Sequence, residues 1–169
     1  MVYLILIIEF TLVKFFHMKN RGFEEVNIIL KKFKNNQVIL PARATMNSAG
    51  YDFFAAEDKL LQPKEQYMFW TDVKAYMLED EVLKIYIRSS LAIKNDLSLV
   101  NQTGIIDSDY YSNITNDGNI GICLKNNSNE VFQIHLGDRI AQGVFEKYLK
   151  IDNDNNDTTR IGGVGSTNA

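Results

Sequence analysis

The chain has 169 residues, of which 46% are hydrophobic and 23% charged, and its formal net charge is −3. These values are typical of one globular domain with a core of its own, and the absence of a basic tract argues against a nucleic-acid or membrane partner. The single cysteine, Cys123, cannot form an internal disulfide or a Cys/His zinc cluster, which favours a protein of the reducing cytoplasm.

Residues 1–17 are mostly apolar. The run is shorter than the ~20 residues of a membrane span, and it has neither the basic start nor the small-residue cleavage site of a signal peptide. Met18 opens Met-Lys-Asn-Arg-Gly-Phe-Glu, which is typical of a translation start that leads into a strand. We therefore expect residues 1–17 to be an upstream extension that is not part of the native chain. A short membrane anchor and an added strand are the alternatives.

Strand-like runs recur at short intervals from about Phe23 onward, separated by clusters of Gly, Asn, Asp, Pro and Lys. The runs are 26–30, 37–40, 67–70, 82–87, 105–110, 118–124, 131–135 and 140–147. This spacing predicts an all-β fold, an antiparallel sandwich or jelly roll, over residues 18–149. Helical periodicity is poor, and only 73–78 and 90–94 are expected to form short helical turns.

The first segment that could carry chemistry is Ser48-Ala-Gly-Tyr-Asp52. Gly50 indicates an unusual backbone, and Asp52 could hold a hydrated metal ion. An ordinary polar turn is the alternative.

The second segment, Arg88-Ser89-Ser90-Leu-Ala92, directly follows a predicted strand and opens a helical turn. An arginine and two hydroxyl groups at a strand end can form a phosphate pocket. The alternative is that one of the serines only caps the turn.

The run from Asn101 to Tyr110 places two carboxylates and an aromatic ring in what the sequence predicts to be a tight β-hairpin. Two isoleucines lead directly into Asp107, so this carboxylate is expected to be partly buried beside apolar neighbours. Such an environment raises the pKa of a carboxylate and suits a general base. The alternative is that Asp107 and Asp109 are turn residues that hold the hairpin.

The fourth segment, Gly137-Asp-Arg-Ile-Ala-Gln142, is typical of a turn that leads into a strand. Gln142 could orient a water molecule there, although Gly-Asp turns are common in themselves. The two histidines, His17 and His135, are isolated in the sequence, and no catalytic role is expected for either.

The composition changes after Tyr148. Residues 152–159 are Asp, Asn and Thr, which cannot bury apolar area, and they are expected to form a mobile linker within a flexible segment at 150–169. Arg160-Ile-Gly-Gly-Val-Gly-Ser-Thr167 follows. Its glycines can turn backbone N–H groups toward an anion, and Arg160 offers a fork suited to a terminal phosphate. The tail is therefore either a lid that closes on a substrate or a plain disordered terminus.

The order and spacing of these five segments resemble the five motifs of the trimeric dUTP pyrophosphatases, from about Arg21 to the C-terminus. The resemblance implies a β jelly roll and a threefold homotrimer whose subunits share their active sites. It also implies Mg²⁺-dependent hydrolysis of dUTP to dUMP and pyrophosphate. This reaction supplies dUMP and limits the entry of uracil into DNA.

The resemblance further implies a role for individual residues. Asp107 matches the general base that activates a water for attack on the α-phosphorus, and Gln142 matches the residue that helps to hold this water. Arg88 and Ser89 match phosphate ligands. Asp52 matches a carboxylate that reaches the magnesium ion through water.

The sugar and the base are matched as well. Tyr110 corresponds to the ring that packs under the deoxyribose, and Asn101 lies in the hairpin that reads the uracil edge. Asp109 has no such match and is expected to be a structural turn residue. Further substrate contacts are implied for Ser90, Gly104, Ile106, Arg160, Val164, Gly165, Ser166 and Thr167.

Three departures from the family pattern bear on the site. The tail of the family usually carries an aromatic residue that closes over uracil, and this chain has Val164 there. Loss of ring stacking predicts weaker lid closure, by about 1 kcal/mol. Arg160 stands two residues before Gly162 and is followed by Ile161 rather than glycine. After the hairpin, Tyr111-Ser-Asn replaces a glycine and an acidic residue that the family often has.

Two other functions remain open at this stage. A dCTP deaminase shares the fold and the Arg-Ser-Ser segment, but it needs an added glutamate that the strand Gly118-Asn-Ile-Gly-Ile-Cys-Leu124 does not offer. A nucleotide-switched regulator on the same fold, as described for some phage-borne relatives, would bind a protein partner.

Overall fold

The structure of the protein is a computed structural model that describes residues 19–156, 158 and 160–163. The extension expected at residues 1–17 lies outside the described residues, and so do the tail residues Val164, Gly165, Ser166 and Thr167.

The described residues form a mostly β protein with one α-helix, α1 (Ser89–Asn95), and one short 3₁₀ helix, η1 (Ser108–Tyr110). The strands are β1 (Gly22–Glu25), β2 (Ala42–Arg43), β3 (Tyr51–Phe54), β4 (Lys59–Leu61), β5 (Gln66–Trp70), β6 (Val73–Tyr76), β7 (Glu81–Ile87), β8 (Leu97–Leu99), β9 (Gly104–Asp107), β10 (Gly121–Asn126), β11 (Phe132–Ile134) and β12 (Arg139–Lys147). All the pairings between these strands are antiparallel. The predicted antiparallel β class is thus confirmed.

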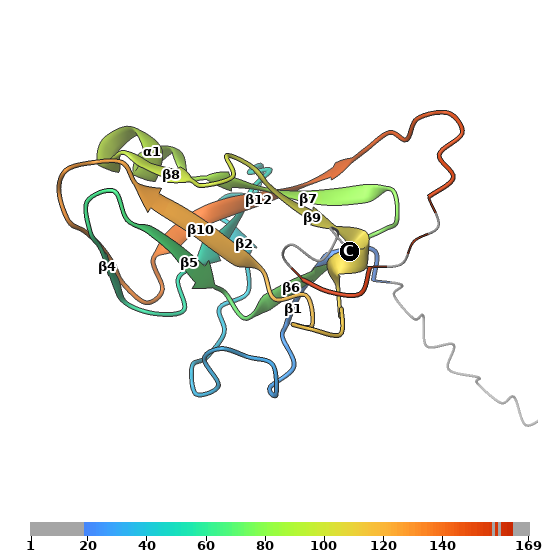
Figure 1. Ribbon diagram of the computed structural model, residues 1–169, viewed down its shortest axis with the longest axis horizontal. Helices are drawn as coiled ribbons and strands as arrows, with labels where there is room; N and C mark the ends of the chain where they lie inside the picture. Colours follow the sequence, from blue (N-terminus) through green and yellow to red (C-terminus); the bar gives the residue numbers. More distant parts are fainter. Residues whose placement is uncertain (1–18, 157, 159, 164–169) are drawn as a thin grey trace, which may run out of the picture.

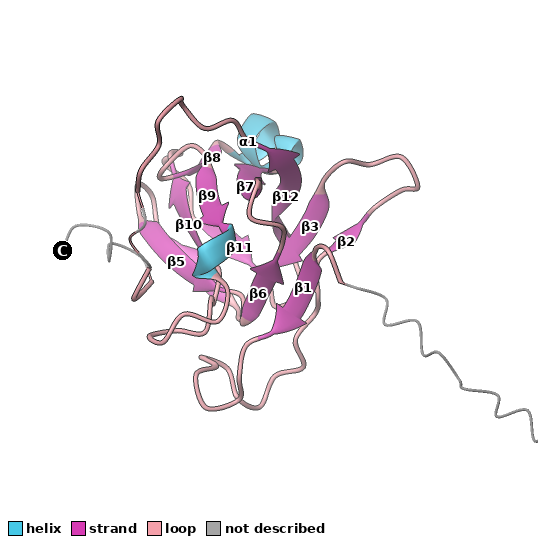
Figure 2. Ribbon diagram, turned by 90° about the vertical axis from the view of Figure 1, so that its right-hand side faces the viewer, coloured by secondary structure: helices cyan, strands magenta, loops and turns pink. Residues whose placement is uncertain are grey.

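Two sheets form the body of the molecule. One has five strands in the order β2-β3-β12-β7-β9, and the other has three in the order β5-β10-β8. The pairs β1-β6 and β11-β4 form two shorter ladders. Figure 2 shows β12 between β3 and β7, in agreement with the strand order. β12 begins within the fourth segment singled out in the sequence, and it thereby lies between the first segment, which leads into β3, and the second segment, which follows β7.

One hydrophobic core joins the two sheets. β10 alternates partly exposed and buried residues along its whole length, as a strand with one face on a core must. Phe53 and Leu83 reach the core from the five-stranded sheet, and Phe69 and Leu124 reach it from the three-stranded sheet; all four are fully buried. Each such side chain contributes about 1.5–3 kcal/mol to folding. The frame around the site is therefore rigidly packed.

The segment from Asn101 to Tyr110 is not the tight hairpin that the sequence suggested. β8 pairs with β10 in the three-stranded sheet, whereas β9 pairs with β7 at the edge of the five-stranded sheet. The turn at residues 100–103 carries the chain from one sheet to the other, and η1 follows Asp107 directly. Two strands joined by a turn give the same local pattern whether or not they pair with each other, so the sequence could not separate the two arrangements.

Residues 73–78, predicted to form a helical turn, contain strand β6 instead. Val73 and Ala75 are both 1% exposed, whereas Lys74 and Tyr76 between and after them are only partly buried. This period of two arises because β6 pairs with β1 and packs one face on the core. The prediction was wrong because so short a run fits both periodicities.

The strand predicted at 26–30 is also wrong, since β1 ends at Glu25. The side chain of Asn27 accepts the N–H of Ile29 at 3.0 Å, and its carbonyl accepts the N–H of Leu30 at 2.8 Å. An asparagine turn therefore ends the strand. The described residues form no strand at 37–40, while β2, β3, β4 and β8 were not predicted.

The helical turn predicted at 90–94 is confirmed by α1. The helix ends at Asp96, whose φ of 52° lies in the left-handed region that closes many helices. In the described part of the chain, no helix is long and apolar enough to cross a membrane.

Candidate active site

The predicted site residues gather in two pockets. The β9 pocket has a volume of about 310 Å³, and the β3–β12 pocket has a volume of about 260 Å³. The β9 pocket is lined by Met68, Ile85, Leu99, Asn101, Gly104, Ile105, Ile106, Asp107, Tyr110, Gly121, Ile122, Cys123, Arg160 and Gly163. The β3–β12 pocket is lined by Ala44, Ser48, Gly50, Asp52, Arg88, Ser89, Ser90 and Gln142. Among the described residues, none lines both pockets.

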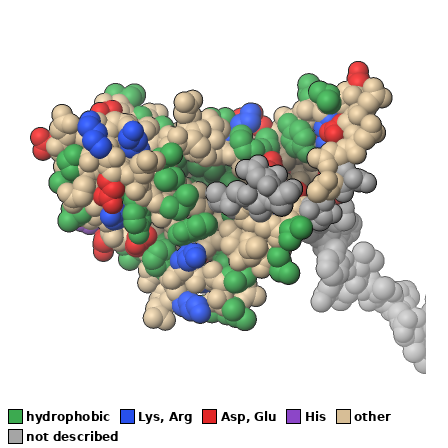
Figure 3. All heavy atoms as spheres, in the orientation of Figure 1, with side chains coloured by type: hydrophobic (Ala, Val, Ile, Leu, Met, Phe, Trp, Pro, Cys, Tyr) green, Lys and Arg blue, Asp and Glu red, His purple; other side chains and the backbone are tan. Residues whose placement is uncertain are grey.

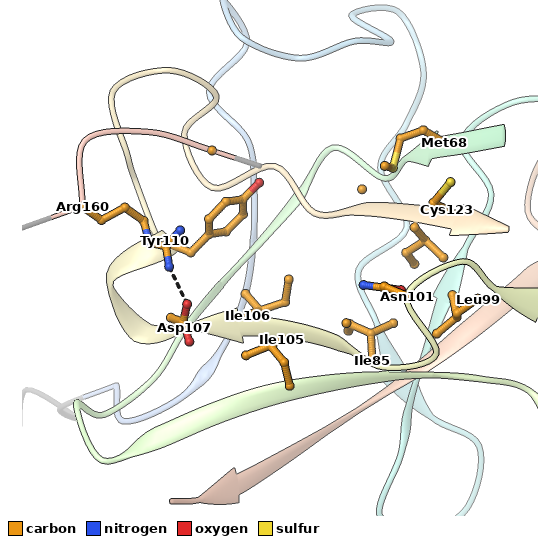
Figure 4. Close-up of a pocket in the computed structure, with 14 residues that line it drawn as sticks. Met68, Ile85, Leu99, Asn101, Ile105, Ile106, Asp107, Tyr110, Cys123 and Arg160 are labelled. Carbon is orange, nitrogen blue, oxygen red and sulfur yellow. Dashed lines mark hydrogen bonds and ion pairs between the residues drawn. The ribbon is translucent and has the colours of Figure 1, made fainter. Parts of the chain in front are cut away.

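The β9 pocket has an apolar end and a charged end (Figure 4). Met68 and Cys123, which face each other across β5 and β10, lie at the apolar end together with the amide of Asn101. Asp107 and Arg160 contact each other at the opposite end. A concave, mostly apolar cavity with a few polar groups is typical of a site for a small molecule.

Asp107 is the last residue of β9, and its side chain is 48% exposed. Burial raises the pKa of this carboxyl above its usual range; the positive charge of Arg160 opposes the rise, and Asp109 adds to it. The predicted partial burial and its effect on the pKa are therefore present. A carboxylate with a raised pKa at the mouth of a pocket is suited to accept a proton from water.

The guanidinium of Arg160 binds two carboxylates at once. It forms an ion pair with Asp107 and a second one with Asp109, where the Nε–Oδ1 distance is 2.8 Å. It also lies over the ring of Tyr110, 5.8 Å from the centroid, and only 15% of its side chain is exposed. Asp109, expected to be a turn residue, thus holds the arginine of the tail as well.

The tail approaches the pocket at a second point. The N–H of Gly163 donates to Oγ1 of Thr115 at 2.9 Å, and Gly163 lines the β9 pocket beside Arg160. In Figure 1 the chain after β12 turns back, and its described end lies next to η1. The sequence indicated a tail able to reach a substrate, but nothing in it pointed to Thr115 as a contact.

Tyr110 is buried, with its ring on the pocket and its hydroxyl in a hydrogen-bond network. The hydroxyl donates to the carbonyl of Asn119 at 2.8 Å and accepts from Nδ2 of Asn116 at 2.7 Å. Gly118 has a φ of 81°, and a Cβ there would lie 2.8 Å from the carbonyl oxygen of Tyr110. The loop after η1 therefore packs closely on the backbone of Tyr110 at Gly118, while Asn116 and Asn119 of the same loop hold the hydroxyl of its ring.

Three more predicted residues line the β9 pocket, namely Asn101, Gly104 and Ile106. Asn101 stands in the turn that follows β8, and its carbonyl accepts the N–H of Thr103 at 2.6 Å. A Cβ on Gly104 would lie 3.1 Å from Cβ of Ile85, so a glycine allows β9 to approach β7 closely. The segment thus lines the pocket along its length, although it is not a hairpin.

In the β3–β12 pocket, Gln142 on β12 faces Asp52 directly across the β3–β12 pairing. A Cβ on Gly50 would lie 2.6 Å from Oε1 of Gln142, which explains why this position is a glycine. The φ of Gly50 is not in the left-handed region, so the close approach of Gln142 rather than an unusual backbone requires a glycine there.

Asp52 is 7% exposed and accepts two arginines, one on each oxygen. Nε of Arg88 lies 3.0 Å from Oδ1, and Nη1 of Arg139 lies 3.3 Å from Oδ2. The carboxylate predicted to reach a metal ion through water therefore holds two cations in this structure. Arg139 was not singled out in the sequence, because its segment is a common turn motif.

Ser89 and Ser90 begin helix α1, and both are exposed on the β3–β12 pocket. The N-cap residue of α1 is Arg88, and among the described residues no side chain caps the helix by a hydrogen bond. The interpretation of these serines as mere caps is therefore wrong. Their hydroxyls stay available to a ligand of the pocket.

The donor set for a metal ion is sparse. In the described part of the chain, no group of three or more His, Cys, Asp or Glu side chains could hold one. Asp52 is the one carboxylate that lines the β3–β12 pocket among the described residues. This set fits an ion such as Mg²⁺, which keeps several waters and is bound through one or two carboxylates and substrate phosphates.

Comparison with known proteins identifies close relatives. The family profile described as dUTPase matches residues 36–168. A deoxyuridine 5'-triphosphate nucleotidohydrolase of Lactococcus lactis is 44% identical over 154 residues, which cover 90% of this chain and 100% of the relative. The crystal structure of the dUTPase from Streptococcus mutans has a TM-score of 0.70 and 38% identity, and the match covers 78% of this chain and 98% of that one. A dUTPase of Staphylococcus bacteriophage 80alpha, described as controlling the transfer of virulence genes by a G protein-like mechanism, has a TM-score of 0.64 and 26% identity over 83% of this chain and 97% of its own.

Proposed function

Because the chain belongs to the dUTPase family, we propose that it hydrolyses dUTP to dUMP and pyrophosphate. The observation that carries this function is the position of Asp107, a half-buried carboxylate with a raised pKa at the charged end of an apolar pocket. About 310 Å³ is enough to receive a base and a sugar. The pocket end beside Asp107 is then the place where the α-phosphate enters.

The β9 pocket binds the nucleoside in this proposal. Asn101 and the neighbouring backbone face the uracil edge, and the ring of Tyr110 packs under the deoxyribose. The hydroxyl of Tyr110 is engaged with Asn116 and Asn119, so the ring is held in one orientation. A sugar with a 2′-hydroxyl then has no room to settle on the ring.

Asp107 acts as the general base. It takes a proton from the water that attacks the α-phosphorus, and pyrophosphate leaves. Arg160 binds Oδ2 of this carboxylate and opposes the rise of its pKa, so Asp107 becomes a stronger base when Arg160 moves to another partner. The terminal phosphate of the substrate supplies the replacement partner for Arg160, because a guanidinium fork binds phosphate and carboxylate alike.

The β3–β12 pocket binds the phosphates. Arg88 offers the charge, and Ser89 and Ser90 offer hydroxyl donors near the bond that breaks, where negative charge develops. Gln142 holds the attacking water. Mg²⁺ bound with the triphosphate, and held through water by Asp52, would neutralise the phosphate charge.

Asp107 and Gln142 of one chain line separate pockets, so both act on one water only if two chains combine their pockets. We therefore include a threefold homotrimer in the proposal. Figure 3 shows hydrophobic side chains at several places on the surface, and Ile93 and Ile105 are 83% and 55% exposed. Single exposed apolar side chains are ordinary on a protein surface, so it is the separation of the two pockets that supports the trimer. Sedimentation equilibrium should give three times the chain mass of 19.3 kDa.

The test is pyrophosphate release from dUTP and, in separate reactions, from dTTP, UTP and dCTP, with Mg²⁺ present or chelated. The wild type should hydrolyse dUTP alone, and chelation should stop the reaction. Asp107→Asn should lose at least about 100-fold in kcat, the smaller end of a general base contribution. Equal hydrolysis of all four nucleotides would refute the proposed substrate, and conversion of dCTP to dUTP would establish the deaminase instead.

A further inference from the structure

We propose that Arg139 is a positioning residue for the triphosphate, and that it acts through Asp52 on Arg88. This inference rests on the proposed function, since it concerns how the β3–β12 pocket holds phosphate. Arg139 does not line that pocket, but it shares a single carboxylate with Arg88, which does. The carboxylate is almost inaccessible to water, because Asp52 is 7% exposed.

A bulge in β12 places Arg139 on the face of Asp52. Arg139 and Gln142 are three residues apart, so in a regular strand they would point to opposite faces of the sheet. The register shifts between Arg139 and Ala141, and as a result Arg139 partners Phe54 while Gln142 partners Asp52. Both partners lie two residues apart on β3 and share one face. The bulge thus brings an arginine to a carboxylate that it could not otherwise reach.

Among the described residues, the ion pair with Asp52 engages only one nitrogen of the Arg88 guanidinium. Its Nε is the atom that binds Asp52, at 3.0 Å, so the two Nη groups of its fork can turn to a ligand. The side chain is 25% exposed and stands between the β3–β12 pocket and a neighbouring hollow of about 250 Å³, which Arg139 also lines. Arg88 therefore lines one side of the β3–β12 pocket, and the ion pair with Asp52 orients the Arg88 side chain.

Arg139 determines the net charge of the group formed by Arg88, Asp52 and Arg139 beside the β3–β12 pocket. Two guanidinium groups on one carboxylate leave a net charge of about +1, which favours a polyanionic ligand. Without Arg139, Oδ2 of Asp52 loses its partner and competes with phosphate for the fork of Arg88. The triphosphate should then bind more weakly, although Arg139 itself does not touch it.

The experiment compares Arg139→Gln and Arg139→Lys with a control, Lys84→Gln. The control breaks an ion pair between β7 and β12, in which Nζ of Lys84 lies 2.7 Å from Oε2 of Glu146, but it leaves Asp52 untouched. Calorimetry measures the affinity for dUMP and for a non-hydrolysable α,β-imido analogue of dUTP. The dUTP reaction gives kcat and KM, and thermal unfolding gives Tm.

Arg139→Gln should weaken binding of the triphosphate analogue about tenfold, as expected for one charged hydrogen bond, and should raise KM for dUTP in proportion. Affinity for dUMP should change by less than about threefold, because fewer phosphate oxygens depend on the fork. Arg139→Lys should recover part of the loss, since it restores the charge without the fork. Lys84→Gln should bind both nucleotides like the wild type.

A double-mutant cycle identifies the route of the effect. If Arg139 acts through Asp52, then Arg139→Gln added to Asp52→Asn should cause no further loss of analogue affinity. Fully additive losses would overturn the inference, and so would unchanged affinity of Arg139→Gln. Equal weakening of dUMP and the analogue, together with a lower Tm, would show a merely structural role and also overturn it. The proposed function fails by a different result, namely absence of pyrophosphate release from dUTP by the wild type.

Discussion

Replacement of Gly50 by alanine tests whether the position of Gln142 matters to the reaction. Gly50 lies just before β3, and a Cβ there would stand 2.6 Å from Oε1, 3.3 Å from Cβ and 3.4 Å from Cδ of Gln142. Of these atoms only the amide oxygen is far too close. It is the end of a flexible side chain, so the side chain moves and the strand stays in place.

The size of the movement follows from the distances. The amide oxygen has to retreat by roughly 0.8 Å to reach an ordinary contact distance. A misplacement of about 1 Å in a group that positions a reactant costs as much as about 100-fold in rate. We therefore expect kcat of Gly50→Ala to fall between about 10-fold and 100-fold. The free energy of unfolding should change by less than about 1.5 kcal/mol, since one side chain leaves its preferred rotamer.

The assay is steady-state pyrophosphate release from dUTP together with thermal unfolding. Gly22→Ala is a matched control, because a Cβ at Gly22 would lie 2.5 Å from the hydroxyl oxygen of Tyr76, again the end of a long side chain. Gly22 is on β1 and lines neither pocket. Its variant should lose a similar amount of stability and keep kcat. If Gly50→Ala keeps the wild-type kcat, then Gln142 does not hold the attacking water and the reasoning is wrong.

The other predictions concern the β9 pocket and the tail. Because burial raises the pKa of Asp107 above the usual 3.8, the base form is populated only above that raised value, and kcat/KM should fall as the pH is lowered through it. The same shift means that the folded chain binds this proton more tightly than the unfolded chain does, so any stability from Asp107 is present at low pH and is lost as the pH rises through the folded pKa. Asp107→Asn should therefore lose at least about 100-fold in kcat without a lower Tm at pH 7, and a clearly lower Tm would contradict the sign of the pKa shift. Tyr110→Phe removes the hydroxyl that donates to Asn119, which should cost about 1–2 kcal/mol in urea unfolding while KM for dUTP stays within about threefold; a large rise in KM would show that the hydroxyl binds substrate. Val164→Phe should improve kcat/KM by up to about tenfold through ring stacking on the base, and an unchanged value would count against the lid interpretation.

Much of the β framework could be predicted from the sequence, because alternation and turn residues are local properties. The long strands β7 and β12 were found within a residue at each end, and so was the helical turn of α1. Short strands such as β3 and β8 were missed, since three or four residues give too little periodicity. β6 was read with the wrong period for the same reason.

The residues of the candidate site also fall into two groups, those that a local pattern indicates and those that only strand pairing brings to a pocket. Asp107, Arg88 and Gln142 were indicated by the types and spacing of residues in short segments. Such a segment can be recognised without knowing which other segments lie beside it. Met68 and Cys123 could not be indicated, because they line the β9 pocket only through the pairing of β5 with β10. Their sequence positions are 55 residues apart by number and carry no polar signal.

The sequence by itself determined the class of fold, the short segments that supply the candidate site residues, and the partly buried setting of Asp107. Only the tertiary structure decided which of these residues meet. The turn before β9 joins two sheets, the bulge in β12 brings Arg139 to Asp52, and Asp107 and Gln142 of one chain face different pockets. The physical reason is that strand pairing and register depend on packing between segments distant in the chain. A local pattern determines which face of a strand is apolar, but it does not determine which other strand pairs with it.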